Sequence, residues 1–300
     1  MFEVSRLTFL RAVHRSESVG AAARELGYTS SAVSQQIGKL EREVGTQLLE
    51  PAGRGVVLTE AALVLVEASE AIDAALETAQ DRLETLTESL TGTLRLACFP
   101  SGIRGLAAPA LRLLKEASPE LQLHLKELAP EPALEALRGG YVDVALVHDW
   151  EHDRTSFPAG LQAVHLADDP VDLLVPVTHP LARRRSAELT ETVDDVWVTD
   201  VSDGICTRWI LDMLNAATTR PRVQFRAEEY ASQVELVASG LCIAVLPRLG
   251  RPVLPETVRV VPLSGPVPTR RVHVVTRKSS ATPRPSVALL LRALGLQVAG

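Results

Sequence analysis

A group of short polar side chains near the amino terminus is the first feature of this sequence that could bind another molecule. Ser31, Ser34 and Gln35 fall on one face of a predicted helix, because Val33 and Ile37 recur at helical spacing on the other face. Short side chains let a helix approach base edges in the DNA major groove, and a glutamine amide donates and accepts at once, as adenine requires. This face predicts base recognition, although a solvated helix face would have the same composition.

Further polar and basic groups flank this face. Thr29, Ser30 and the first N–H groups of the helix suit a phosphate group. We include Lys39 among the candidate DNA-binding residues, together with Arg54 in a glycine-rich turn. An arginine at such a tip can enter a narrow minor groove, but an exposed loop arginine without that role is an open alternative.

The elements that must position these groups are three short helices and a hairpin. Apolar residues at helical spacing predict helices over 7–13, 19–26 and 30–44, with Ser18 as the cap of the second. Gly27 and Gly45 are predicted to end the second and third helices. Two compact helices joined by a tight glycine turn are typical of a helix-turn-helix, and the segment 47–59 predicts two short strands that form a wing.

The next segment predicts one long helix that pairs with a partner. Residues 59–90 contain neither glycine nor proline, and apolar residues recur along them in a heptad pattern. Eight acidic residues against one arginine make the rest of this helix polar. We interpret it as a dimerisation helix, and packing against the chain's own domains is the alternative. The seam residues are Ala62, Leu65, Ser69, Ile72, Leu76, Ala79, Leu83, Leu86 and Leu90.

The remaining two hundred residues predict two α/β lobes, because strands alternate with helices twice in the same order. The first set is expected at 93–98, 102–117, 121–127, 132–138 and 142–147, and the second at 196–200, 204–217, 222–226, 230–239 and 241–246. Strands at 161–166 and 171–175 would carry the chain across, and strands at 258–262 and 271–276 would carry it back before a last helix at 287–296.

Two strand-to-helix turns are expected to face a cleft between these lobes. Each places a serine, Ser101 or Ser202, beside a helix amino terminus, where free N–H groups favour an anion. Each serine could equally cap its own helix. Asp200 and Asp203 lie beside Ser202 and could instead hold an amine, so we expect a small polar metabolite. His148 follows a predicted buried strand and is a further candidate for the cleft.

Composition excludes several classes of protein. The chain has 300 residues, 46% of them hydrophobic and 23% charged, which is typical of a folded protein with two or three domains. Its three cysteines indicate neither a disulfide framework nor a zinc ribbon, so we expect a reducing, cytoplasmic environment. Neither an export signal nor a membrane span is expected. The net charge of −6 hides the nearly balanced charge of residues 1–58, so DNA contact is expected only there.

The run from Ala21 to Glu50, followed by Leu58-Thr-Glu-Ala, resembles the winged helix-turn-helix of LysR-type transcriptional regulators. The segment 237–247 is similar to a late strand motif of the same family. The resemblance implies a mixed fold, in which an α-helical winged helix-turn-helix and a long linker helix precede a two-lobed α/β domain like that of periplasmic binding proteins. The expected domains are 1–58 for DNA binding, 59–91 for the linker, and 92–300 for the effector, with lobe I at 92–163 and 266–300 and lobe II at 164–265.

The same resemblance implies a function and site residues. It implies a regulator that binds double-stranded promoter DNA as a homodimer or homotetramer through the linker helix, and that responds to a small-molecule effector. Its DNA contacts would fall on Ser30, Ser31, Ser34, Gln35 and Arg54. Its effector contacts would fall on Ser101, Gly102, Ile103, Thr199 and Ser202.

The sequence disfavours two other functions. An enzyme on a two-lobed scaffold is disfavoured, because neither a G-x-S-x-G motif, a P-loop nor a paired-carboxylate cluster is present, and we expect no catalytic residue. A plain solute-binding protein is also disfavoured, because it would need an export signal and we expect none. His148 and His152 among acidic residues do not have the spacing of a zinc site, so no metal or cofactor is expected. A redox switch through Cys98 or Cys206 is less favoured than two buried thiols.

Overall fold

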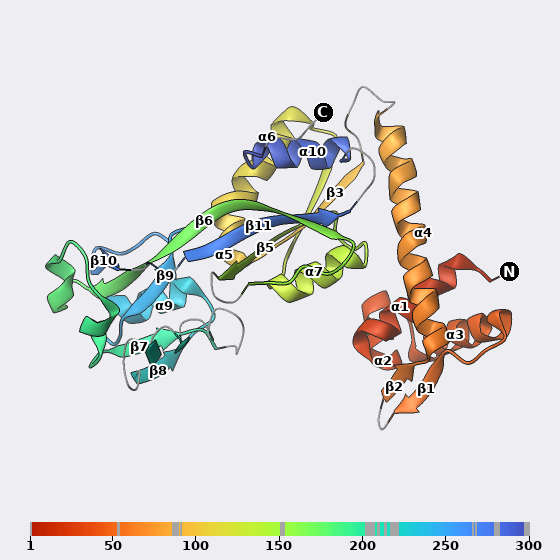
Figure 1. The fold of residues 1–300 in the computed structure, drawn as a ribbon, viewed down its shortest axis with the longest axis horizontal. Helices are drawn as coiled ribbons and strands as arrows, with labels where there is room; N and C mark the ends of the chain where they lie inside the picture. Colours follow the sequence, from red (N-terminus) through yellow and green to blue (C-terminus); the bar gives the residue numbers. More distant parts are fainter. Residues whose placement is uncertain are drawn as a thin grey trace. The chain divides into compact units, whose positions relative to one another are not determined.

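The computed structural model describes residues 2–296 apart from 53–54, 86–89, 91, 151–153, 202–207, 209–210, 213–214, 217–221, 266, 268 and 279–282 (Figure 1). The chain divides into two compact units, residues 1–83 and residues 84–300. Each unit has its own buried apolar core, and we describe each by itself.

The first unit begins with the predicted helices. A short 3-10 turn, Val4–Arg6, leads into α1 (Leu7–Ser16), α2 (Val19–Leu26) and α3 (Ser30–Val44). The side chain of Ser18 accepts a hydrogen bond from the Ala21 N–H and so caps α2. Gly27 and Gly45 end α2 and α3 with φ of 72° and 76°, the left-handed conformation that glycine adopts at least cost. The predicted stops are therefore confirmed.

A hairpin and a long helix complete this unit. Strands β1 (Leu49–Ala52) and β2 (Gly55–Leu58) pair antiparallel, and α4 (Glu60–Thr85) follows directly. Ala62 and Val66 of α4 are buried in the same core as Leu10 and Leu40, and the buried Arg11 donates to the Ser69 hydroxyl at 3.2 Å.

The start of the seam is therefore covered by the chain's own helices, which is the alternative to a partner helix for this part of α4. The physical reason is that α1 to α3 alone cannot enclose their apolar core, so α4 closes it. Further along the seam, Leu76 is 63% exposed.

The second unit has the predicted alternation of strands and helices. Parallel strands β3 (Thr93–Cys98), β4 (Gln122–Glu127) and β5 (Val144–Trp150) form one side of a mixed sheet. The helix after β3 is nearly continuous, as α5 (Pro100–Gly102), a π-helical turn (Ile103–Ala107) and α6 (Ala108–Ala117). Helix α7 (Pro130–Arg138) joins β4 to β5, and α10 (Pro285–Ala293) comes last.

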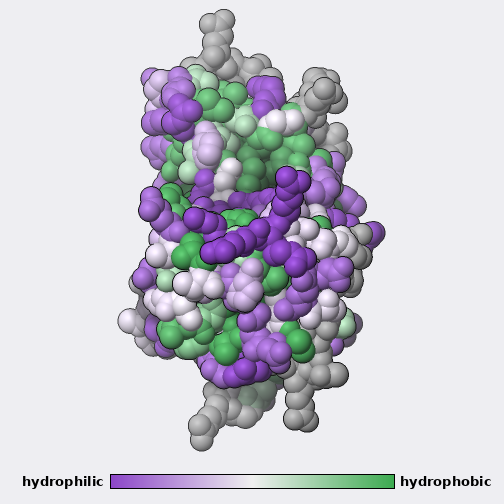
Figure 2. Space-filling view, turned by 90° about the vertical axis from the view of Figure 1, so that its left-hand side faces the viewer, coloured by the Kyte–Doolittle hydropathy of each residue, from purple (hydrophilic) through white to green (hydrophobic). Residues whose placement is uncertain are grey.

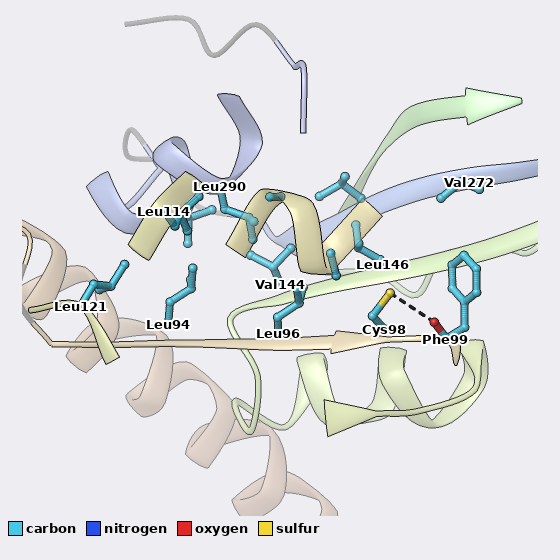
Figure 3. Close-up of a cluster of buried hydrophobic side chains, with 14 residues drawn as sticks. Leu94, Leu96, Cys98, Phe99, Leu114, Leu121, Val144, Leu146, Val272 and Leu290 are labelled. Carbon is cyan, nitrogen blue, oxygen red and sulfur yellow. Dashed lines mark hydrogen bonds between the residues drawn. The ribbon is translucent and has the colours of Figure 1, made fainter. Parts of the chain in front are cut away.

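The helices of this first lobe cover both faces of its sheet (Figure 1). Leu94, Leu96, Val144 and Leu146 point from β3 and β5 toward Leu114 of α6 and Leu290 of α10 (Figure 3). On the other face, α7 packs Leu134 and Leu137 against the sheet. The two-sided covering explains why these strands are continuously apolar rather than alternating.

The second lobe repeats this order. Strands β7 (Val196–Thr199) and β8 (Arg222–Arg226) are parallel, and α9 (Tyr230–Ala238) leads to β9 (Ala244–Pro247). Two 3-10 turns, Pro180–Arg183 and Leu189–Thr192, precede β7. Strand β9 pairs with β6 (Leu161–Pro176), and so does β10 (Val258–Pro262). On the left-hand face of the molecule in Figure 1, hydrophilic side chains run between two groups of apolar ones (Figure 2).

Two long antiparallel strands, β6 and β11 (Thr269–Arg277), join the lobes. We predicted two separate strands at 161–166 and 171–175, and this prediction is wrong because β6 is continuous through Asp168 and Asp169. These polar residues resemble a loop in sequence, but Asp169 pairs with Arg270 of β11 inside the protein. The predicted helix at 204–217 lies largely outside the described residues.

Candidate functional sites

The exposed face of α3 in the first unit carries the predicted polar residues. Ser30, Ser31, Ser34, Gln35 and Lys39 are all exposed. Val33, Ile37 and Leu40 are buried on the opposite face, so the helical period separates the two sets. This face can present hydroxyl and amide groups to a groove.

Two neighbouring glutamines show how sharply this face is divided. Gln36 turns inward, where its amide oxygen accepts from the Arg6 guanidinium at 3.3 Å, and Gln35 stays exposed. The side chain of Thr29 caps α3, because its hydroxyl accepts from the Ala32 N–H at 3.2 Å and lies 3.0 Å from the Ser31 hydroxyl. Thr29 therefore has a structural role at the place where a phosphate was expected.

The wing is held firmly against the helices. A carboxylate oxygen of Glu41 in α3 accepts from the Leu48 and Leu49 N–H groups at 2.8 and 3.3 Å. Gly55 packs against the turn between α1 and α2, where a side-chain carbon at its position would lie 2.8 Å from the Glu17 carbonyl oxygen. These contacts fix the base of β1 and the start of β2 next to the tip, and the predicted tip residue Arg54 lies outside the described residues.

The second unit contains a cleft of about 520 Å³ between its lobes. Described residues from both lobes line this cleft. They are Phe99, Pro100, Ser101, Arg104, Glu127, Leu128, Ala129, Pro130, Glu131, His148, Asp200, Glu228, Glu229, Tyr230 and Arg270. Most of them follow directly on the carboxyl ends of the parallel strands β3, β4, β7 and β8, where ligands of α/β sheets bind.

Ser101 is a fixed part of the cleft wall. Its side chain is 3% exposed, and its hydroxyl accepts from the Arg270 guanidinium at 3.0 Å. Ser101 therefore does not cap its own helix, which was the alternative to ligand binding. The residue at the cap position is Phe99. The Ser101 carbonyl also meets Gly250 of the other lobe so closely that a side-chain carbon at Gly250 would lie 2.0 Å from its oxygen.

His148 lies deeper, beneath the ring of Phe99. The two rings meet edge to face with centroids 4.6 Å apart. Burial holds the pKa of His148 well below its usual range, and the positive charge of Arg270 lowers it further. The imidazole is therefore neutral at physiological pH. It can take part in hydrogen bonding with a ligand but adds no charge to the cleft.

The other predicted effector residues have a different place. Among the described residues that line the cleft, Gly102, Ile103 and Thr199 do not occur. Gly102 is buried against Cys98 and Phe99, where a side-chain carbon would come within 2.8 Å of the thiol sulfur. Thr199 is buried and its hydroxyl donates to the Asp200 carbonyl at 3.3 Å. Effector contact by Gly102, Ile103 and Thr199 therefore stays a prediction, and Ser202 lies outside the described residues.

The sequence reading missed the charged residues of the cleft. Arg270, Glu228, Glu229 and Tyr230 were not predicted as site residues, although Glu228 and Glu229 stand between a predicted strand and the predicted helix that Tyr230 begins. Their position after a strand could have predicted them, because ligands of α/β sheets bind at the carboxyl ends of strands. Arg270 had no such signal, because only the fold brings β11 beside Ser101.

The two described thiols are buried. Burial raises the pKa of Cys98 to about 12 and that of Cys242 to about 11, so both are protonated at neutral pH. Cys206 and His152 lie outside the described residues. Within the described part of the chain, no three or more histidine, cysteine, aspartate or glutamate side chains are grouped so that they could hold a metal ion. None of the described helices is long and apolar enough to cross a bilayer.

Two family models match the sequence. The helix-turn-helix of bacterial regulatory proteins of the lysR family matches residues 4–63, and the LysR substrate binding domain matches residues 87–297. The first match covers the α3 face and the wing, and the second covers the cleft.

Several known proteins are similar along nearly the whole chain. A probable hydrogen peroxide-inducible genes activator of Mycobacterium avium is 30% identical over 273 residues, which cover 90% of this chain and 86% of the relative. A full-length OxyR variant of Pseudomonas aeruginosa superposes with a TM-score of 0.67 at 23% identity, over 99% of this chain and 95% of that one. CbnR, solved in complex with its target DNA, has a TM-score of 0.58 at 18% identity, over 98% and 99% of the two chains.

Proposed function

Because this chain belongs to the LysR family of transcriptional regulators, we propose that α3 reads promoter DNA and that the cleft binds the small molecule that controls it. The chain is a regulator and not an enzyme. The observation that carries the DNA-binding assignment is the exposed polar face of α3 opposite its buried apolar face.

We assign the DNA contacts as follows. Gln35 makes a bidentate contact to a base, and Ser31 and Ser34 are small enough to let α3 enter the major groove. Ser30 and the first turn of α3 bind a phosphate, while Thr29 holds that turn in place by capping it. Lys39 and Arg54 add contacts to the DNA backbone and to the minor groove.

We assign effector binding to the cleft wall formed by Ser101 and His148. Both residues lie on the first lobe, while Asp200 and Glu229 approach the same cavity from the second. A ligand that touches both lobes favours one arrangement of β6 and β11 over others, which shifts the population of the regulator between states. Gly102, Ile103 and Thr199 stay candidate effector contacts beside this wall.

We propose that α4 mediates assembly into a homodimer or homotetramer. Its first half packs on its own DNA-binding helices, but Leu63, Val64 and Leu76 remain exposed on an acidic helix. An apolar residue on such a helix is best covered by a second copy of the same helix. A protein that binds promoter DNA must meet it in the compartment that holds it, so we place this regulator in the cytoplasm.

The name of the M. avium relative raises a second candidate signal, hydrogen peroxide. Peroxide reacts with thiolates, and neither Cys98 nor Cys242 forms one readily, because burial raises the pKa of both thiols. A metabolite in the cleft is therefore the signal that the described residues favour.

A mobility-shift titration with the DNA upstream of the gene tests this function. The full chain should bind that DNA with an affinity that falls steeply as salt rises, because phosphate contacts release counterions. Ser34→Glu should abolish the shift by placing a charge at the groove. Gln122→Glu adds the same charge to an exposed position of β4 and should leave the shift unchanged. Binding that ignores both salt and Ser34→Glu would refute the assignment.

A further inference from the structure

The cleft is lined mainly by negative charge. Five acidic residues line it, Glu127 and Glu131 from the first lobe and Asp200, Glu228 and Glu229 from the second. Among the residues that the structure describes, the four glutamates have no basic group within ion-pair distance. A ligand in this cavity therefore meets carboxylates from both lobes.

The two basic residues of the cleft are already engaged within the protein. Arg270 is buried and forms an ion pair with Asp169, whose oxygen lies 2.5 Å from the guanidinium. The Arg104 guanidinium donates to the Gly250 carbonyl oxygen at 2.6 Å. The charge of Arg270 is neutralised by Asp169, which leaves the single positive charge of Arg104 against five acidic residues, so the cavity favours a cation.

The helix ends at the cleft are poor anion sites. Helix α7 begins with Pro130, and Pro132 follows two residues later, so two of the first three positions lack an N–H donor. Pro100 removes the first donor of α5 in the same way. Glu131 and Glu229 stand at the starts of α7 and α9, where their negative charges further disfavour an anion.

An aromatic ring in the cleft is compatible with a cation. The Arg104 guanidinium lies 6.0 Å from the centroid of the Tyr230 ring, within the range of a cation–π contact. Because the described part of the chain has no group of three metal-ligating side chains, these carboxylates do not form a metal cage. Their separation over two lobes fits an extended organic cation better than a compact ion.

We propose that the effector is an organic cation that carries amine or guanidinium groups. This inference rests on the proposed function, in which the cleft is the effector site. Carboxylates of the two lobes repel one another across the cavity, and a cation between them removes that repulsion. Binding therefore favours the approach of the lobes, and ligand charge becomes the signal that is sensed.

Three molecules with the same five-carbon skeleton test the inference on the full chain. They are 1,5-diaminopentane, 1,5-pentanediol and glutarate, and agmatine is added as a guanidinium ligand. Calorimetry and the thermal midpoint should show binding by the two cations and at least tenfold weaker binding by the diol and by glutarate. Raising the salt concentration should weaken the binding of the cations.

Variants connect the effect to the cleft. Glu228→Gln with Glu229→Gln should weaken diamine binding about tenfold, the usual effect of losing a charge-assisted contact. Glu120→Gln changes an exposed glutamate outside the cleft and should have no effect.

The inference is overturned if the cations bind no better than glutarate, or if the double variant binds them as well as the unmodified chain does. The mobility shift with promoter DNA separates this failure from failure of the proposed function. A chain that binds its promoter but prefers glutarate remains a regulator with a different effector. A chain that never binds the promoter loses the proposed function itself.

Discussion

The guanidinium of Arg270 donates to the hydroxyl of Ser101 at 3.0 Å, although 169 positions separate the two residues in the sequence. Arg270 is 1% exposed and also pairs with Asp169, which is 3% exposed. This contact joins β11 and β6, the two strands that connect the lobes, to the start of α5 at the wall of the cleft. A ligand at Ser101 is therefore one contact away from the strands that set the angle between the lobes.

The buried ion pair of Arg270 and Asp169 predicts that removing one partner lowers stability more than replacing both. Arg270→Met leaves Asp169 charged and buried without its partner, which should lower the free energy of unfolding by about 3–5 kcal/mol. Adding Asp169→Asn should restore a large part of it, because the amide oxygen can still accept from the Leu249 N–H, which lies 2.8 Å from the carboxylate. Urea unfolding followed by circular dichroism measures both. Equal stability of the single and double variants would contradict this account.

Gln35→Ala should relax base preference at one position of the operator. The lost bidentate contact is worth about 1–3 kcal/mol of discrimination against the wrong base. Selection of binding sites from a randomised DNA pool measures the change. Gln36→Ala is the matched control, because Gln36 faces Arg6 instead of solvent and should leave the preference intact. An unaltered preference in the Gln35 variant would refute the contact.

Lys39→Ala should weaken binding to every sequence alike, since a lysine at the DNA backbone reads charge and not bases. The slope of log affinity against log salt should fall by about one unit. Arg54→Ala should also weaken binding across sequences. Fluorescence anisotropy with two unrelated duplexes at several salt concentrations measures both. A loss confined to one duplex would reassign the residue to base recognition.

Leu76→Glu should shift the chain toward monomers, because Leu76 is exposed on the part of α4 that its own core does not cover. The substitution puts a carboxylate into an apolar seam between acidic helices, where charges repel. Sedimentation velocity over a range of concentrations measures the assembly. Glu67→Gln, which alters an exposed residue of the same helix, should not change it. An unchanged oligomer in the Leu76 variant would place the interface elsewhere.

Stability should fall as the pH drops below about 6.5, the ordinary pKa of histidine. Burial lowers the pKa of His148 in the folded chain, and burial also lowers that of His273. The unfolded chain therefore binds protons that the folded chain does not bind. Each histidine lowers the free energy of unfolding by up to about 1.4 kcal/mol per pH unit. Urea unfolding at pH 8.0 and 5.5 measures the loss. His148→Asn should reduce this dependence, and an unchanged dependence would show that His148 is not the source.

Local sequence patterns predicted the elements well. Ser18, Gly27 and Gly45 mark helix ends by capping and by left-handed backbone, which depend on a few neighbouring residues. The apolar spacing in α3 predicted which face is buried for the same reason. Strand β6 was the exception, because Asp169 is stabilised by Arg270, a partner 101 residues away.

The sequence by itself determined helix α3, the wing and the two α/β repeats, because the spacing of apolar residues, the helix caps and the turns are local properties of the chain. Only the tertiary structure decided the composition of the cleft. It placed Arg270 against Ser101, turned Gly102 and Thr199 into the interior, and gathered glutamates of two lobes around one cavity. The physical reason is that burial and electrostatic fields depend on neighbours in space, and these neighbours meet only when β6 and β11 pair.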